Sequence, residues 1–135
     1  VEVEHYSKVI NIEALTMLEM LRKQIAPAVA GYSSEVASAA AAKQAVSDKL
    51  SVRSETKLLE KLSAGADELS DAIDELQEAV DKATAESDEP AKSYLYHDAV
   101  LPAMEKARKA SDTLERICSE DYWPLPSYSR MLYYV

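Results

Sequence analysis

The feature that most constrains the fold is a seven-residue repeat of apolar residues in the middle of the chain. Apolar residues recur there at alternating intervals of four and three, at Leu62, Ala66, Leu69, Ile73, Leu76, Val80 and Ala83. This spacing places them on one stripe of an α-helix and is typical of helices that pack lengthwise on each other. The same spacing returns at Tyr96, Val100, Ala103, Ala107, Ala110, Leu114 and Ile117. The sequence therefore predicts an all-α fold.

Breaks in the apolar pattern divide the chain into three long helices and a tail within a single domain. Asn11 is suited to cap a first helix over residues 11–49. A polar break with Ser51 and Ser54 precedes a second helix over 54–86, and a Ser-Asp-Glu-Pro string precedes a third over 89–119. Short connections between them favour an up-down-up bundle.

Two prolines lie inside the predicted helices. Pro27 in the first helix and Pro102 in the third each lack a backbone N–H donor, so we expect each helix to bend there. Gly31 marks the same weak point of the first helix. The alanine-rich segment Ala37–Ala42 predicts close helix packing, because small side chains let backbones approach.

Charge limits the classes of partner. The net charge is −9, and the stretch from Arg53 to Glu86 holds four basic and ten acidic residues, which gives −6. Seven acidic residues lie opposite the heptad stripe and predict a solvated face: Asp67, Glu68, Asp71, Asp74, Glu75, Glu78 and Asp81. We therefore expect neither nucleic acid nor an anionic membrane as a partner.

Cysteine content and hydropathy bear on the compartment. Cys118 is the only cysteine, so an internal disulfide is excluded, and its simplest interpretation is a small buried apolar residue. No stretch reaches the ~20 apolar residues of a membrane span, and no signal peptide is recognisable. These features predict a cytoplasmic protein.

Aromatic residues are concentrated at the end of the chain. Five of the nine lie in the last fourteen positions, and Pro124 and Pro126 forbid a regular helix there. We interpret residues 120–135 as a docking tail that either covers its own bundle or docks on a partner. The candidate packing residues are Tyr122, Trp123, Pro124, Pro126, Tyr128, Leu132 and Tyr133.

No pattern of reactive residues predicts an active site. Glu2 and His5 give one Glu-x-x-His spacing, but a di-iron bundle needs two copies and further inward-facing glutamates. His97 beside Asp98 is typical of a surface pair. The only two glycines are isolated within predicted helices, which excludes a glycine-rich phosphate loop. We assign no catalytic, cofactor-binding or metal-binding residue to this chain.

Three stretches resemble the C-terminal region of type III glutamine synthetases. They are VINIEALTMLEM (Val9–Met20), HDAVLPAMEKAR (His97–Arg108) and, most specifically, YWPLPSYSRML (Tyr122–Leu132). The resemblance implies a parent enzyme that ligates ammonia to glutamate with ATP and divalent metal (Mg), in an upstream catalytic domain. It also implies a homo-oligomer, with residues 1–10 as the end of that preceding domain.

Two functions follow from these patterns. The first is a non-catalytic C-terminal module of such an enzyme, which packs against the catalytic domain or a neighbouring subunit. The alternative is a free-standing helical interaction domain that binds a partner helix through its heptad stripe.

Overall fold

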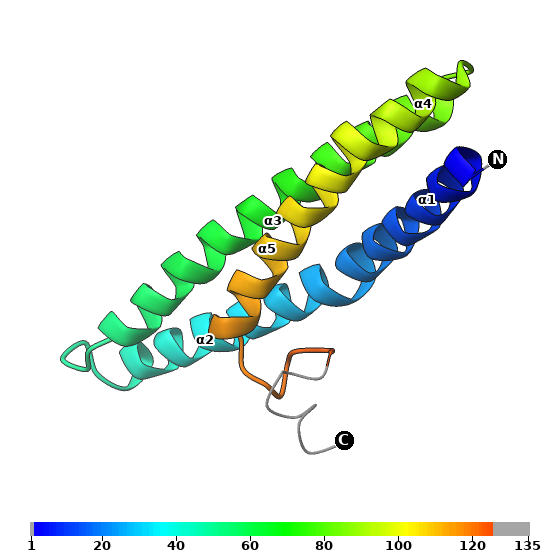
Figure 1. The fold of residues 1–135 in the computed structure, drawn as a ribbon. Coiled ribbons are helices and arrows are strands. Elements are labelled where there is room, and N and C mark those ends of the chain that lie inside the picture. Colours follow the sequence, from blue (N-terminus) through cyan, green and yellow to red (C-terminus); the bar gives the residue numbers. More distant parts are fainter. Residues whose placement is uncertain (1, 126–135) are drawn as a thin grey trace.

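The computed structural model describes residues 2–125, and within that range all regular structure is helical. The elements are α1 (Glu2–Met20), η1 (Leu21–Ile25), α2 (Ala26–Val46), α3 (Arg53–Ala85), α4 (Glu89–Leu95), η2 (Tyr96–Val100) and α5 (Leu101–Ile117). The π-helical turns η1 and η2 join their neighbours without a break, which gives three long continuous helices (Figure 1). The predicted all-α class is confirmed for this part of the chain.

The three continuous helices lie side by side. In Figure 1, α3 returns beside α1 and α2, and the helix from α4 to α5 then runs back along α3. The core forms where the stripes of the three meet, and its largest fully buried side chains are Leu21, Ile25, Leu62, Leu69, Leu76, Leu114 and Val100. The heptad residues of α3 therefore face the core along most of the helix.

The first helix begins at Glu2, so the predicted start at Asn11 is wrong. Its buried stripe runs through Ile10, Ala14 and Leu18, and the position one turn earlier is a buried serine, Ser7. Because Ser7 is polar, the apolar repeat does not extend to residues before Ile10. The repeat therefore does not predict the first part of the helix. At the other end the backbone becomes extended after Val46, three residues before the predicted end.

Each internal proline follows a π-helical turn. The N–H of Ala26 donates to the carbonyl of Leu21, and the N–H of Leu101 donates to that of Tyr96, both five residues back. Pro27 and Pro102 come next in the chain. A widened turn accommodates a residue that lacks an N–H and whose ring crowds the preceding carbonyls. The helices therefore continue past both prolines, and Figure 1 shows that α1 and α2 point in different directions.

The helix α3 matches its predicted range to within one residue at each end. Its heptad residues are buried apart from Ala66, which is half-buried, and all seven acidic residues opposite them are exposed, as predicted. Gly65 lies where α3 meets α5. A Cβ placed there would lie 2.6 Å from Cδ2 of Leu114, so a larger residue at this position would require the Leu114 side chain to shift.

The third helix starts as the sequence predicts. The Asp88 carboxylate accepts a hydrogen bond of 3.1 Å from the N–H of Ala91, and Pro90 occupies the first turn. The helix ends at Ile117, two residues before the predicted end at residue 119. There the N–H of Cys118 donates to the carbonyl of Leu114 at 2.8 Å.

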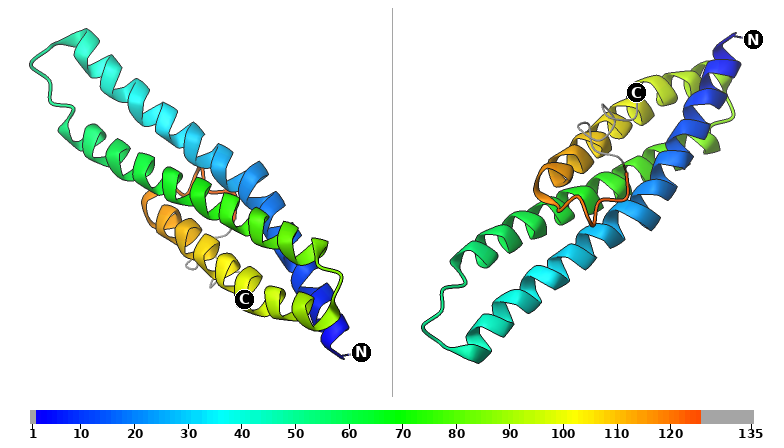
Figure 2. Two further views of the ribbon diagram at one scale, coloured as in Figure 1. Left: turned by 90° about the horizontal axis from the view of Figure 1, so that it is seen from above. Right: turned by 90° about the horizontal axis from the view of Figure 1, so that it is seen from below.

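The second half of α2 and the start of α3 extend beyond the end of α5 as a two-helix arm (Figure 2). Ala37, Ala39, Ala41 and Ala42 are exposed there, and Val46 is 80% exposed. The prediction of close packing at Ala37–Ala42 is therefore wrong. Alanine stabilises a helix whether it is buried or exposed, so an alanine-rich stretch does not by itself indicate burial.

Candidate functional site

The aromatic segment that follows α5 turns back sharply. The N–H groups of Tyr122 and Trp123 both donate to the carbonyl of Ser119, at 3.0 and 3.1 Å. The N–H of Asp121 donates to the Ser119 hydroxyl at 3.3 Å. These bonds direct the chain away from the axis of α5 and toward α2, where the segment lies in Figures 1 and 2.

Trp123 is part of the hydrophobic core. Its side chain is 6% exposed and lies in the same cluster as the heptad residues of α3. The indole Nε1 is fully buried and has no hydrogen-bond partner among the described residues. A buried donor without a partner costs about 1–3 kcal/mol, so the apolar contacts of the ring must exceed this penalty.

Tyr122 is partly buried and packs against Tyr32 of α2. Its ring centroid lies 5.4 Å from that of Tyr32, with the ring planes tilted by 46°. The ring lies beside Gly31, where a Cβ would be 3.5 Å from Cε1 of Tyr122, an ordinary van der Waals contact. Burial, and then the negative charge of Glu35, raise the pKa of the Tyr122 phenol above its ordinary value. The phenol is thus held in its neutral form where it lies on α2.

The structure describes only part of the predicted tail. It places Trp123 in the core, Tyr122 half-buried on α2 and Pro124 at the surface. Four predicted packing residues lie outside the described residues: Pro126, Tyr128, Leu132 and Tyr133. The assignment of the whole tail as a docking element therefore stays a prediction.

Asn11 has a different role from the predicted helix cap. It lies in the middle of α1, and its Oδ1 accepts a hydrogen bond of 3.1 Å from the hydroxyl of Tyr96 in η2. Burial raises the pKa of this tyrosine. The hydrogen bond joins the first and third helices, and its two residues are 85 positions apart in the sequence. Local sequence patterns cannot predict a contact over this separation.

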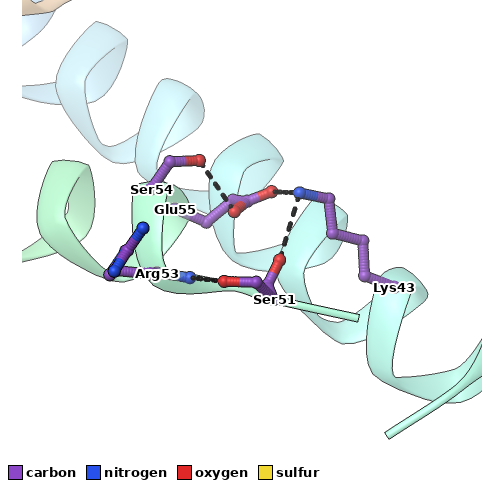
Figure 3. A network of polar contacts seen from close by, with 5 residues as sticks. All are labelled: Lys43, Ser51, Arg53, Ser54 and Glu55. Carbon is purple, nitrogen blue, oxygen red and sulfur yellow. Dashed lines mark hydrogen bonds and ion pairs between the residues drawn. The ribbon is translucent and has the colours of Figure 1, made fainter. Parts of the chain in front are cut away.

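A polar network closes the tip of the two-helix arm (Figure 3). The Lys43 ammonium pairs with the Glu55 carboxylate and also lies 3.4 Å from the carbonyl of Ser51. Ser54 donates to Glu55 at 3.0 Å, and the Ser51 hydroxyl accepts from the N–H of Arg53 at 3.2 Å. Lys43 and the other donors hold the pKa of Glu55 below its ordinary value. The network fastens the end of α2 to the start of α3.

Carboxylates of α3 lie next to lysines of α5. A groove of about 600 Å³ between α3 and α5 is lined by four acidic residues, but also by two lysines. Lys106 donates to both oxygens of Glu75, at 2.9 and 2.7 Å. Among the side chains that the structure describes, no three of His, Cys, Asp or Glu are grouped so that they could hold a metal ion. We assign no catalytic step to the described residues.

The remaining candidates are surface or core residues. His97 Nδ1 and Asp98 Oδ1 are 2.8 Å apart on an exposed turn of η2, and His5 is exposed on α1. Cys118 is buried, and burial raises the pKa of its thiol, which keeps it in the less reactive neutral form. None of the described helices is both long and apolar enough to cross a membrane.

Sequence patterns did not reveal an apolar surface on α1. We call it the outer face of α1 and define it by Tyr6, Val9, Ile12 and Leu15, which are all exposed. At 3.6 residues per turn, Val9 and Ile12 lie opposite the buried stripe, and the other two flank them. The face was missed because its first two residues were placed before the predicted helix. In the described part of the chain, the other large exposed apolar residues are Val46, Leu50 and Tyr94.

Comparison with known proteins relates the chain to one enzyme family. The family described as glutamine synthetase C-terminal domain matches residues 1–44, which cover α1, η1 and most of α2. A glutamine synthetase of Butyrivibrio fibrisolvens is 30% identical over 130 residues, which are 96% of this chain and 19% of that relative. The chain thus spans about a fifth of the length of the curated relative that it matches. Residues 1–44 therefore match the family described as glutamine synthetase C-terminal domain, and nearly the whole chain is similar to about a fifth of a glutamine synthetase.

Proposed function

We propose that the chain is the non-catalytic C-terminal module of a type III glutamine synthetase, folded as an up-down-up bundle with an aromatic tail. Its direct role is to pack against the catalytic domain and to support subunit assembly. The observation that carries this proposal is the coverage of the likeness: nearly the whole chain matches, yet it accounts for only 19% of the relative. A module of a larger enzyme explains both values.

The chemistry of the proposed parent is the ATP-dependent, magnesium-dependent ligation of ammonia to glutamate in the cytoplasm. We place that chemistry in the part of the parent outside this chain, since the chain matches only 19% of the relative. The features of this chain suit a supporting role instead. Its three helices share one core, the Asn11–Tyr96 hydrogen bond joins the first to the third, and the Trp123 ring is buried against them.

The alternative function is a free-standing domain that binds a partner helix through its heptad stripe. That stripe is already used inside the molecule, because Leu62, Leu69, Ile73, Leu76 and Val80 are all buried. A partner helix would have to displace the chain's own helices to reach them. We therefore favour the module of a larger enzyme.

Truncation of the parent polypeptide tests the role in assembly. We expect the full polypeptide to form oligomers with ligase activity, and a version that ends just before Val1 to form oligomers with fewer subunits or to show a lower Tm. The 135-residue chain alone is expected to show no ligase turnover. An unchanged number of subunits, Tm and activity after the truncation would show that the module has no part in packing or assembly.

A further inference from the structure

The outer face of α1 is the most concentrated exposed apolar surface among the described residues. It holds four of the seven large apolar side chains that are exposed there, and Ile12 at its centre is 64% exposed. Charged and polar side chains surround it, including His5, Lys8 and Glu13. An apolar centre with a polar rim is the usual composition of a protein–protein contact surface. Patches of a few hundred Å² on a monomer are often functional.

The position of this face in the chain indicates what covers it. The glutamine synthetase relative extends far beyond the part that matches, and the matched family is described as a C-terminal domain. The additional chain of such an enzyme therefore precedes α1. Leu15 lies only about 20 Å along the helix axis from Glu2, at 1.5 Å of rise per residue. A domain joined directly to α1 reaches this face without a long linker.

We propose that the outer face of α1 is the surface on which the catalytic domain of the same polypeptide docks. This inference rests on the proposed function and adds the contact surface to it. The helix that carries the face lies within residues 1–44, which match the family. Covalent connection makes the contact intramolecular, so a small apolar patch is sufficient to hold two adjacent domains together.

Site-specific photo-crosslinking in the full polypeptide tests this contact. Ile12→p-benzoylphenylalanine places a crosslinker at the centre of the face, and Ile12 is exposed enough to accept it without disturbing the core. Val46→p-benzoylphenylalanine is the control, because Val46 is also an aliphatic side chain and, at 80%, is even more exposed than Ile12. Crosslinked products are separated by mass under denaturing conditions, and the joined peptides are identified by mass spectrometry.

The proposal predicts that the Ile12 variant joins peptides that precede Val1 and keeps the mass of a single polypeptide, at least tenfold more efficiently than the Val46 variant. Three results would overturn it: equal yields at both positions, products of doubled mass that join two copies of α1, or products that join only a neighbouring subunit. Ligase activity of the same full polypeptide is measured in parallel. Activity without the Ile12 crosslink overturns this inference alone, whereas a native protein of only 135 residues overturns the proposed function as well.

Discussion

Replacing Trp123 by alanine tests whether the aromatic segment is part of the core. The indole is 6% exposed and packs in the same cluster as the heptad residues, although the segment follows the last helix. If the segment were only a surface appendage, removing the ring would have little effect on stability. If it closes the bundle, the substitution leaves a cavity at the junction of the tail with the helices.

The expected loss follows from two opposing effects. Truncating a buried tryptophan to alanine costs about 3–5 kcal/mol, from lost burial and from the cavity. The variant also removes the buried Nε1–H, which has no described partner, and so recovers about 1–3 kcal/mol. We therefore expect the free energy of unfolding to fall by about 2–3 kcal/mol, which corresponds to a decrease in Tm of about 6–12 °C for a domain of this size.

Two matched variants separate these effects. Trp123→Phe keeps an apolar ring and removes the unpaired donor, so we expect it to stay within about 1 kcal/mol of the parent. Tyr94→Ala truncates an aromatic side chain that is 66% exposed, and we expect a change below about 0.5 kcal/mol. Urea unfolding followed by far-ultraviolet circular dichroism measures all three. A Trp123→Ala loss no larger than that of Tyr94→Ala would refute the reasoning.

Three further outcomes are expected. Gly65→Ala lowers the free energy of unfolding by about 1 kcal/mol, since overpacking against Leu114 outweighs the gain in helix propensity. In a Leu114→Ala background we expect this loss to disappear. A loss that persists there would exclude the contact with Leu114 as its cause. Lys43→Met raises the pKa of Glu55 toward its ordinary value of 4.5, as measured by NMR titration. The Lys43–Glu55 pair stabilises the folded state above pH 4.5, and this stabilisation is lost as pH falls through the lowered pKa, so the variant lacks it. An unchanged pKa of Glu55 would contradict the network. Because the pKa of the Tyr122 phenol is raised in the folded state, the stability that this group supplies is present below its ordinary pKa of 10.0 and is lost as pH rises above that value. We therefore expect Tyr122→Phe to reduce the loss of stability between about pH 9 and 11. Identical plots of stability against pH for the two proteins would show that Tyr122 does not cause the loss.

The helix α3 and the start of α4 were predictable because local signals agree there. Seven heptad positions define the buried stripe of α3, and Asp88 followed by Pro90 marks the next helix start in the sequence itself. The acidic face of α3 follows from the same period. These features depend on residues close together in the chain, so periodicity and capping rules are sufficient for them.

Other features depend on contacts or backbone choices that the sequence leaves open. A proline shows only that one N–H is absent, so the π-helical turns before Pro27 and Pro102 are one of several solutions. Ser7 is buried although its side chain is polar, so the sequence pattern gives no sign of its burial. The first part of α1, and with it the outer face of α1, was therefore not predicted. The role of Asn11 depends on Tyr96, which lies in another helix.

The mass of the native gene product tests the central claim most directly. The chain is 14.9 kDa and matches 19% of its relative, so a parent of similar length has about five times this mass. An antibody raised against the 135-residue chain, used on a lysate of the source cell, measures it. The account predicts one band several times heavier than 14.9 kDa that copurifies with ATP-dependent glutamine synthesis. A band at 14.9 kDa would contradict it and identify a free-standing helical protein.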